Sequence, residues 1–465
     1  MLKRSFRPIS VLLYTTACLG IVYVLFRPHV VDSIRSKPLH IYSVLLFLVS
    51  CVLVLIIAYK STFFLPSLFL LIFFVGGPLL GPANFRRYLE THADFFGRDM
   101  PSFDFPTFVW SLGTVSFFVG AFVAWALIPR LGRAWAVLWD RKRLLLFLQL
   151  SLLLSTVGTL VGIFRIGYIP LFAPGGGDMR LEYGNMVGPF AGRFSGEFWI
   201  LPNLLSSMLF VLEKGKKRHM YLFVTVVCAL GTLLYAGRTG VVLVVFAFGL
   251  MYFKSSKVGL SRLLLLAGVT LPLMYGLMLQ GEYRGGLDLS RWTALERIEA
   301  VTLSEWKEYS VVVDETRTSS DYTGWRTFVG PFFTLIPGPI FTLLGSNKSD
   351  LITRYSAVFH YGREFDVPMG MRIGPIGEAF AAFGFTGVFL QMVVLGVFFG
   401  MLEKLYIGLG KEDARLCVVC YFLSLMLFLP ITTMLTLLAP LLNTGVFVFA
   451  YHILGTRRYA APELR

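Results

Sequence analysis

The 465-residue chain is 56% hydrophobic and only 15% charged, and it contains 44 phenylalanines. Soluble domains carry about 25% charged residues, so this composition excludes an ordinary soluble enzyme and predicts a membrane protein. The net charge of +15 would suit a nucleic-acid-binding protein, but the basic residues gather between apolar segments, which indicates membrane topology instead.

Apolar segments long enough to cross a bilayer recur along the chain. A hydrocarbon core about 30 Å thick requires about 20 apolar residues in a helix. By this rule the chain is an all-α polytopic membrane protein with about twelve transmembrane helices. The first segment lacks a small-x-small cleavage site and is predicted to be an uncleaved span. The predicted spans are 9–26, 40–59, 63–80, 107–128, 144–165, 188–212, 220–236, 239–253, 263–280, 373–402, 416–430 and 438–454.

A long polar stretch, Gly281–Arg372, separates the ninth predicted span from the tenth. Within it, Leu289–Val313 predicts a helix at the membrane interface. Phe328–Leu344 is apolar but interrupted by prolines, and it predicts a re-entrant or surface-docked hairpin. The predicted organisation is therefore spans one to nine in residues 1–280, a partly helical outer loop that caps a membrane-embedded site in residues 281–372, and spans ten to twelve with a tail in residues 373–465.

Charge asymmetry predicts the orientation of the spans. If the N-terminus lies in the cytoplasm and the spans alternate, the cytoplasmic segments hold 22 of the 42 Lys and Arg residues but only 6 of the 27 acidic residues. This is the positive-inside pattern. It predicts that both termini are cytoplasmic and that residues 281–372 lie outside, and it leaves no reason to expect nucleic-acid binding.

Three features lie at the predicted outer ends of spans. Gly167–Asn185 contains prolines and a triple glycine, so its backbone is predicted to be poorly helical. Gly237 and Arg238 join two short spans. Glu378 lies in the first turns of the tenth span, where it could act as a general base, as a partner of the helix dipole or in an ion pair.

Several catalytic motifs are absent from the sequence. There is no GxxxxGK[ST] loop, no DxD, no HExxH and no GxSxG, and the six histidines are scattered. These absences argue against ATP hydrolysis, against a cytoplasmic nucleotide-sugar transferase that holds its diphosphate through a metal, and against a zinc site; no cofactor is predicted. Cys417 and Cys420 form a CxxC inside an apolar segment, where two small apolar side chains are expected in place of a redox or metal site.

Arginines cluster near the predicted outer ends of the spans. Guanidinium remains charged and binds phosphate through two hydrogen bonds, whereas placing it near hydrocarbon costs about 2.5–3.5 kcal/mol on insertion scales. Such a cluster suits a polyprenyl-diphosphate substrate, although Arg193 could pair with Glu197 and Arg165 could extend towards the interface. Arg363 and Arg372 could instead form loop ion pairs with Asp366. The cluster is Arg165, Arg180, Arg193, Arg238, Arg284, Arg354, Arg363 and Arg372.

Short sequence words give the chain a family resemblance over residues 140–455. They are IPLF…MRLEYGN at 169–185, YAGRTGVVLVV at 235–245, EYRGG at 282–286, PFFTLIPGPIF at 331–341 and IGPIGEAFAAFGFTGVF at 373–389. Together with the order of the spans, these words resemble the Wzy-type polymerases of oligosaccharide repeat units, which make O-antigen and enterobacterial common antigen.

The resemblance implies a function and a set of site residues. It implies a glycosyltransferase in the bacterial inner membrane that moves a growing glycan from undecaprenyl diphosphate onto a new lipid-linked repeat unit at the outer leaflet, without a metal. A chain-length regulator protein is a candidate partner besides the lipid-linked glycan and the bilayer. The candidate catalytic residues are Glu378, Arg372 and His360, and the candidate diphosphate- or glycan-binding residues are Arg180, Arg193, Arg238, Arg284 and Arg363.

Two alternatives stay open at the level of sequence. An O-antigen ligase uses a similar lipid donor, but its loop histidine is followed by glycine eight residues later, whereas His360 is followed by Pro368. A lipid-linked oligosaccharide flippase would be expected to show repeated halves with interrupted spans, and the sequence contains no internal repeat.

Overall fold

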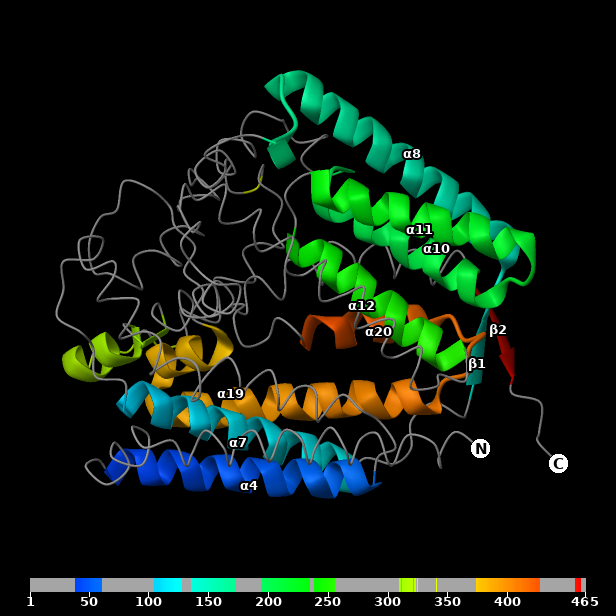
Figure 1. The fold of residues 1–465 in the computed structure, drawn as a ribbon. Coiled ribbons are helices and arrows are strands. Elements are labelled where there is room, and N and C mark those ends of the chain that lie inside the picture. Colours follow the sequence, from blue (N-terminus) through cyan, green and yellow to red (C-terminus); the bar gives the residue numbers. More distant parts are fainter. Residues whose placement is uncertain are drawn as a thin grey trace, which may run out of the picture. The chain divides into compact units, whose positions relative to one another are not determined.

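The computed structural model describes residues 38–60, 104–127, 135–172, 194–234, 238–255, 309–310, 312–320, 322, 324, 340, 374–426 and 456–460. These residues are almost entirely helical (Figure 1). The chain divides into two compact units, each assembled from segments far apart in the sequence. Unit 1 comprises Met1–Pro129, Glu299–Lys404 and Met426–Ala439, and unit 2 comprises Arg130–Ile298, Leu405–Leu425 and Pro440–Arg465.

Three long apolar helices lie side by side in unit 1: α4 (Pro38–Lys60), α7 (Asp104–Leu127) and most of α19 (Gly374–Gly408) (Figure 1). Glycines let α7 and α19 approach closely. A Cβ at Gly120 would collide with the Val393 carbonyl, and a Cβ at Gly396 would collide with the carbonyl of Phe117. Small residues at such contacts are typical of helix packing in membranes, where dispersion contacts drive association.

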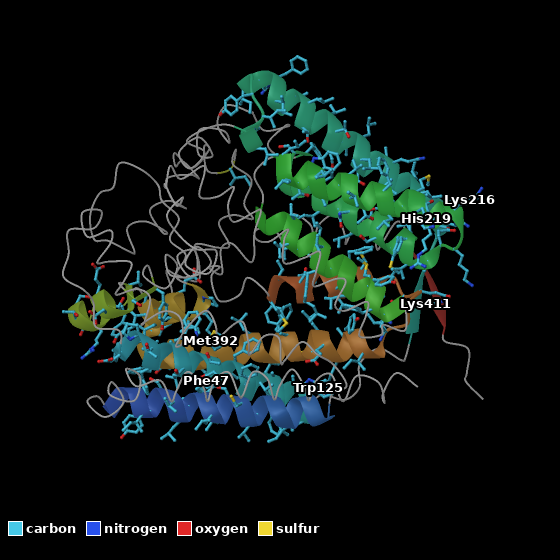
Figure 2. The ribbon with its side chains drawn as sticks, in the orientation of Figure 1. Phe47, Trp125, Lys216, His219, Met392 and Lys411 are labelled. Atoms are coloured by element: carbon cyan, nitrogen blue, oxygen red, sulfur yellow. The ribbon has the colours of Figure 1, made fainter. Side chains whose placement is uncertain are left out.

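Two charged residues near the end of α19 bond to Trp125, near the end of α7, in unit 1. The Trp125 indole Nε1 donates to Glu403 Oε2 at 3.3 Å, and Lys404 Nζ donates to the Trp125 carbonyl at 2.8 Å. Both charged side chains are buried, and buried charges are tolerated when they are hydrogen-bonded. Figure 2 shows Trp125 in this region of α7 and Met392, which is fully buried, on α19.

The helix α19 reverses direction near its start. Phe383 (φ −142°, ψ 21°) and Gly384 (φ 61°, ψ −143°) leave the helical region. Gln391 Nε2 donates to the Pro375 carbonyl at 3.2 Å, although sixteen residues of straight helix would hold these two residues about 24 Å apart. A Cβ at Gly387 would collide with the Ala379 carbonyl. Residues 374–382 therefore form a short helix that folds back, antiparallel, on residues 385–408, and the two form a helical hairpin.

This reversal corrects the prediction of one unbroken span over residues 373–402. A glycine within an apolar run was interpreted as part of a continuous helix, whereas Gly384 adopts a backbone conformation that ends it. The remaining straight helix, 385–408, is roughly 36 Å long at 1.5 Å per residue, which is still sufficient for a bilayer.

Unit 2 is built around α10 (Ile200–Leu212), in which every residue from 200 to 211 is buried. The helices α8 (Arg141–Ile166) and α11 (Lys216–Leu234) pack against it, as does α12 (Arg238–Ser255). Each of α8 and α11 runs antiparallel to α10. Arg141 forms an ion pair with Glu213 at one end of α8 (2.6 Å), whereas Thr159 Oγ1 accepts from Trp199 Nε1 near the other (2.9 Å).

The turns of unit 2 follow from local chemistry. Asp140 caps α8 by accepting from the backbone N–H groups of Lys142 and Arg143. Gly167, at φ 76°, ends α8 in the left-handed conformation that glycine adopts most easily. A 3₁₀ turn, η3 (Pro170–Phe172), follows, in agreement with the predicted poorly helical loop. Figure 2 shows Lys216 and His219 at the start of α11.

The helix α20 (Arg415–Leu425) also belongs to unit 2 and packs on α12. Lys254 Nζ at the end of α12 donates to the carbonyls of Tyr406 and Ile407 at 2.8 and 2.9 Å, where α19 ends. Cys417 and Cys420 are buried, free thiols, as the sequence predicts. Cys51 and Cys228 are buried thiols too, and the four described cysteines form no disulfide.

A short antiparallel ladder departs from the predicted all-α fold. Strand β1 (Trp135–Trp139) pairs with β2 (Thr456–Ala460), and Trp135 faces Ala460 while Trp139 faces Thr456. The ladder joins two segments that lie more than three hundred residues apart in the chain.

Eight of the twelve predicted spans overlap described helices, but α10 covers only residues 200–212 of the span 188–212, α20 covers only residues 416–425 of the span 416–430, and the span 373–402 is broken by the reversal at Gly384. Within the part of the chain that the structure describes, four helices are long and apolar enough to cross a membrane: α7, α8, α11 and α19. The predicted spans 9–26, 63–80, 263–280 and 438–454 lie outside the described residues. The predicted domain boundaries at residues 280 and 372 lie outside them too and stay predictions.

Candidate functional site

The short helix 374–382 of unit 1 carries the one candidate catalytic residue whose side chain lies within the described residues, Glu378. Gly374 adopts φ 64°, and Pro375 follows in the first turn, where its fixed φ and missing N–H suit a helix start. Ile376 packs against Gly113 of α7, at which a Cβ would lie 2.7 Å from Ile376 Cδ1. The N-terminal end of the short helix is therefore pressed against the backbone of α7.

Aromatic rings surround the tip of the hairpin. The ring of Phe380 lies 5.6 Å from Phe105 of α7 and 5.6 Å from Phe385, in edge-to-face contacts. The Gly324 N–H donates to the Ala382 carbonyl at 2.9 Å, so a carbonyl released by the helix reversal finds a donor in the segment from the long polar stretch. The ring of Tyr322 lies 3.2 Å from where a Cβ of Gly384 would stand.

Part of the long polar stretch packs on α7. Residues 312–319 are helical, and Tyr309 just before them is only 1% exposed. Its hydroxyl donates to the Pro106 carbonyl at 3.0 Å, and its ring meets Trp110 edge-on at 5.0 Å. The guanidinium of Arg317 stands 4.4 Å from the centre of the Phe105 ring. These contacts fix the segment to the same end of α7 as the hairpin tip.

This helix extends beyond the predicted interfacial helix, which was expected to end at Val313. Threonine and serine side chains after Val313 form hydrogen bonds within the helix. Thr318 and Ser319 donate to the carbonyls four residues earlier, at 2.8 and 2.9 Å. Residues 289–308 and all of the predicted hairpin Phe328–Leu344 except Ile340 lie outside the described residues.

Burial raises the pKa values of two residues in this segment, Asp314 and Tyr309. Burial raises the pKa of Asp314 above its usual value of 3.8, and the positive charge of Arg317 partly opposes this rise. Burial also raises the pKa of Tyr309 well above 10.0, so this hydroxyl remains a hydrogen-bond donor at any physiological pH.

Glu378 lies in the second turn of the short helix and is 8% exposed. A carboxylate close to a helix N-terminus is stabilised by the helix dipole, typically by about 0.3–1 kcal/mol. A carboxylate held in a buried, ordered position can also accept a proton from a hydroxyl group. The position of Glu378 is compatible with both roles.

Comparisons with known proteins decide the family. The family model described as O-antigen polysaccharide polymerase Wzy matches residues 186–461, more than half of the chain. The chain belongs to this family. No curated protein and no solved structure matches.

Membership of the Wzy family makes the chain a multi-pass membrane protein that polymerises O-antigen repeat units. The matched residues include α10, α11, α12, the hairpin of α19 and α20. The fold-back helix with Glu378 therefore lies within the part of the chain that defines a Wzy polymerase.

The described part of this Wzy polymerase covers few of the predicted arginines. Arg238 is the first residue of α12 in unit 2, and the position of its side chain is not described; residues 235–237, which include Gly237 of the predicted turn, lie outside the described residues. The remaining candidates lie outside the described residues: Arg180, Arg193, Arg284, His360, Arg363 and Arg372.

The predicted pairing of Arg193 with Glu197 assumed a continuous α-helix, and this assumption is wrong. The two residues were expected one turn apart on a continuous span, residues 188–212. Gly196 adopts φ 57°, Glu197 lies in a 3₁₀ turn, η4 (Gly196–Trp199), and the α-helix begins only at Ile200. No unbroken α-helix joins the two residues, so helical spacing does not place them on one face.

Sequence reasoning missed Gln391 at this site of the Wzy polymerase. Gln391 is 9% exposed and holds the start of the short helix through the Pro375 carbonyl. The available signal was an amide side chain in the middle of an apolar span, which requires a hydrogen-bond partner in hydrocarbon.

Proposed function

We propose that this Wzy polymerase transfers a growing glycan from undecaprenyl diphosphate onto a lipid-linked repeat unit, at the outer leaflet of the bacterial inner membrane and without a metal. The observation that carries the proposal is the family match over residues 186–461, which includes the buried Glu378 on a fold-back helix. The same match favours a polymerase over the ligase and the flippase.

The leaving group of this reaction is a diphosphate. Breaking the bond between the anomeric carbon and oxygen develops negative charge, which preorganised cations stabilise. The candidate cations are Arg180, Arg193, Arg238, Arg284 and Arg363. Support for Arg238 comes from its place at the start of α12, because the first N–H groups of a helix and its dipole also favour a phosphate.

The attacking sugar hydroxyl requires a base. Glu378 is the first candidate because its carboxylate is buried at the start of a short helix. His360 is the second candidate, and Arg372 is proposed to assist as a cation. Neither a metal nor another cofactor is needed for this chemistry, since arginines can stabilise the diphosphate.

The proposed orientation has both termini in the cytoplasm and the long loop outside. Two observations support it. Strands β1 and β2 are hydrogen-bonded, and this pairing is compatible with the proposal that the segment before α8 and the C-terminal segment are both cytoplasmic. The helices α8, α10 and α11 alternate in direction, as successive spans must. A chain-length regulator is a proposed partner.

An extension assay tests the proposal. Purified protein in lipid vesicles is given a diphosphate-linked repeat unit, with EDTA present and ATP absent. We expect a ladder of longer glycans on a gel. Arg238→Ala and Arg284→Ala should remove the ladder and leave the unfolding temperature nearly unchanged, whereas Arg143→Ala, on the exposed start of α8, should keep it.

Each failure of this assay has a separate meaning. Transport of the lipid-linked unit across the vesicle membrane with no extension would favour a flippase. A ladder that disappears only when EDTA is added would overturn the metal-free mechanism. Full activity in the Arg238→Ala, Arg284→Ala double variant would remove both arginines from the diphosphate site.

A further inference from the structure

The buried N-terminal end of the short helix 374–382 has hydrogen-bonding capacity that the proposed chemistry does not use. The first N–H groups of any α-helix lack an acceptor within the helix. Here they belong to Gly374, Ile376 and Gly377, because Pro375 has no N–H. The fold-back places this end beside Gln391 and against Gly113 of α7, inside unit 1.

Gln391 presents an unused acceptor at the same place. Its Nε2 donates to the Pro375 carbonyl at 3.2 Å, and its side chain is 9% exposed. Its Oε1 is buried and has no hydrogen-bond partner among the residues that the structure describes. Leaving a buried amide oxygen unpaired costs about 1–3 kcal/mol, so such a group needs an explanation.

The orientation of this amide follows from its neighbour. Exchanging the oxygen and nitrogen of Gln391 would turn Oε1 towards the Pro375 carbonyl, where two acceptors would repel each other and neither could donate. Nε2 therefore faces Pro375, and Oε1 is left near the start of the short helix without a donor among the described residues.

The mixture of donors and acceptors indicates what kind of ligand fits. An ionised phosphate only accepts hydrogen bonds, so it would suit the helix N–H groups but would meet the Gln391 Oε1 and the nearby Glu378 carboxylate unfavourably. A sugar hydroxyl donates one hydrogen bond and accepts others. It can donate to Oε1 while accepting from an N–H of the helix, and so satisfy both.

We propose that Gln391 is a substrate-binding residue whose Oε1 accepts a hydrogen bond from one hydroxyl of a repeat-unit sugar bound at the start of the short helix 374–382. The proposal rests on the proposed polymerase function and deepens it. It makes Gln391 a determinant of which sugar the enzyme accepts, because a site that pairs a buried oxygen with a hydroxyl rejects analogues that lack this hydroxyl.

A set of repeat units, each with one hydroxyl replaced by hydrogen, tests this pairing in the extension assay. With the wild-type enzyme, removal of the hydroxyl bound by Gln391 should lower kcat/KM by about 10- to 100-fold. Gln391→Met has a similar volume but no acceptor oxygen. It should be slow with the complete unit and should lose nothing further with the deoxy unit. Equal losses for every deoxy unit in both enzymes would overturn the proposal.

Two further variants separate binding from folding. Gln391→Asn keeps both the amide donor and the oxygen acceptor on a side chain one methylene shorter, so it should remain sensitive to the same hydroxyl, and insensitivity of the folded variant would contradict the pairing. Gln149→Met makes the same substitution at an exposed glutamine of α8 and should respond to every deoxy unit as the wild type does. A purely structural role of Gln391 would lower the unfolding temperature without removing selectivity for one hydroxyl.

A binding measurement keeps this inference separate from the reaction. If the wild-type enzyme extends no repeat unit, the proposed function fails. The water-soluble repeat-unit oligosaccharide should nevertheless raise the unfolding temperature of the wild type and not that of Gln391→Met. The same rise in both proteins would overturn the Gln391 site whatever the reaction.

Discussion

Glu378 carries a charge at a helix start and has a carboxylate that can accept a proton. One substitution tests whether the reaction depends on the proton-accepting role. Glu378→Gln preserves the shape of the side chain and most of its hydrogen bonding. If the carboxylate is the base, extension should fall by at least about 100-fold, because a positioned base contributes about 10²–10⁴ to a rate. The rate is measured with the diphosphate-linked unit, alongside the unfolding temperature in detergent.

The matched control is Glu412→Gln, on an exposed carboxylate in the turn before α20. This variant should extend glycans at the wild-type rate. An active Glu378→Gln enzyme would rule out the base and leave the helix-dipole role, for which the expected sign is a slightly lower unfolding temperature.

The substitution Gly384→Ala tests the hairpin of α19, because its effect on stability has opposite signs in a hairpin and in a straight helix. In a continuous helix, Gly384→Ala would stabilise the protein by about 0.5–1 kcal/mol, because glycine is a poor helix former. In the hairpin, Gly384 stands at φ 61° and ψ −143°, with the Tyr322 ring 3.2 Å from an added Cβ. The same substitution should therefore cost about 1–3 kcal/mol and lower the unfolding temperature.

Two other glycines provide controls for this element. Gly387→Ala places a Cβ against the Ala379 carbonyl and should also destabilise the hairpin, for a steric reason. Gly410→Ala, in the turn after α19, meets nothing within 4 Å and should be nearly neutral. A stabilising effect of Gly384→Ala would show that residues 374–408 form one straight helix.

The same elements show what local sequence can and cannot predict. Apolar length was sufficient to predict α7 and α8, since a span about 20 residues long has few alternatives in a bilayer. The reversal at Gly384 was not predictable in this way. Glycine in an apolar run is compatible with a helix, and the contacts that favour the reversal come from Phe105, Tyr322 and Gly324, far away in sequence.

At the candidate site, too, local sequence could not predict contacts between residues far apart in the chain. Glu378 was identified because a carboxylate near hydrocarbon is rare. The role of Gln391 depends on the fold-back that brings it to Pro375, sixteen residues away, and no helical or strand periodicity predicts that contact. The β1–β2 ladder was not predictable for the same reason, because the two five-residue strands lie more than three hundred residues apart in the chain.

At the scale of the whole molecule, the charge distribution makes a prediction about the two faces of the membrane. The four described cysteines are buried and Cys18 lies outside the described residues, so a new surface cysteine can be labelled with little background once Cys18 is replaced by serine. Thr318 and Lys411 are both exposed, the first on the helix 312–319 and the second between α19 and α20. The predicted topology places Thr318 outside and Lys411 in the cytoplasm.

We therefore expect Thr318→Cys to react with a membrane-impermeant maleimide in intact spheroplasts and Lys411→Cys to react only after permeabilisation. The physical reason is the cytoplasmic excess of Lys and Arg, since positively charged loops are retained on the cytoplasmic side. Labelling is measured as a mass shift on a gel, with permeabilised cells showing that both sites are accessible. The reverse labelling pattern would show that the protein has the opposite orientation in the membrane. The long loop and the hairpin tip with its aromatic rings would then face the cytoplasm, which would contradict polymerisation at the outer leaflet.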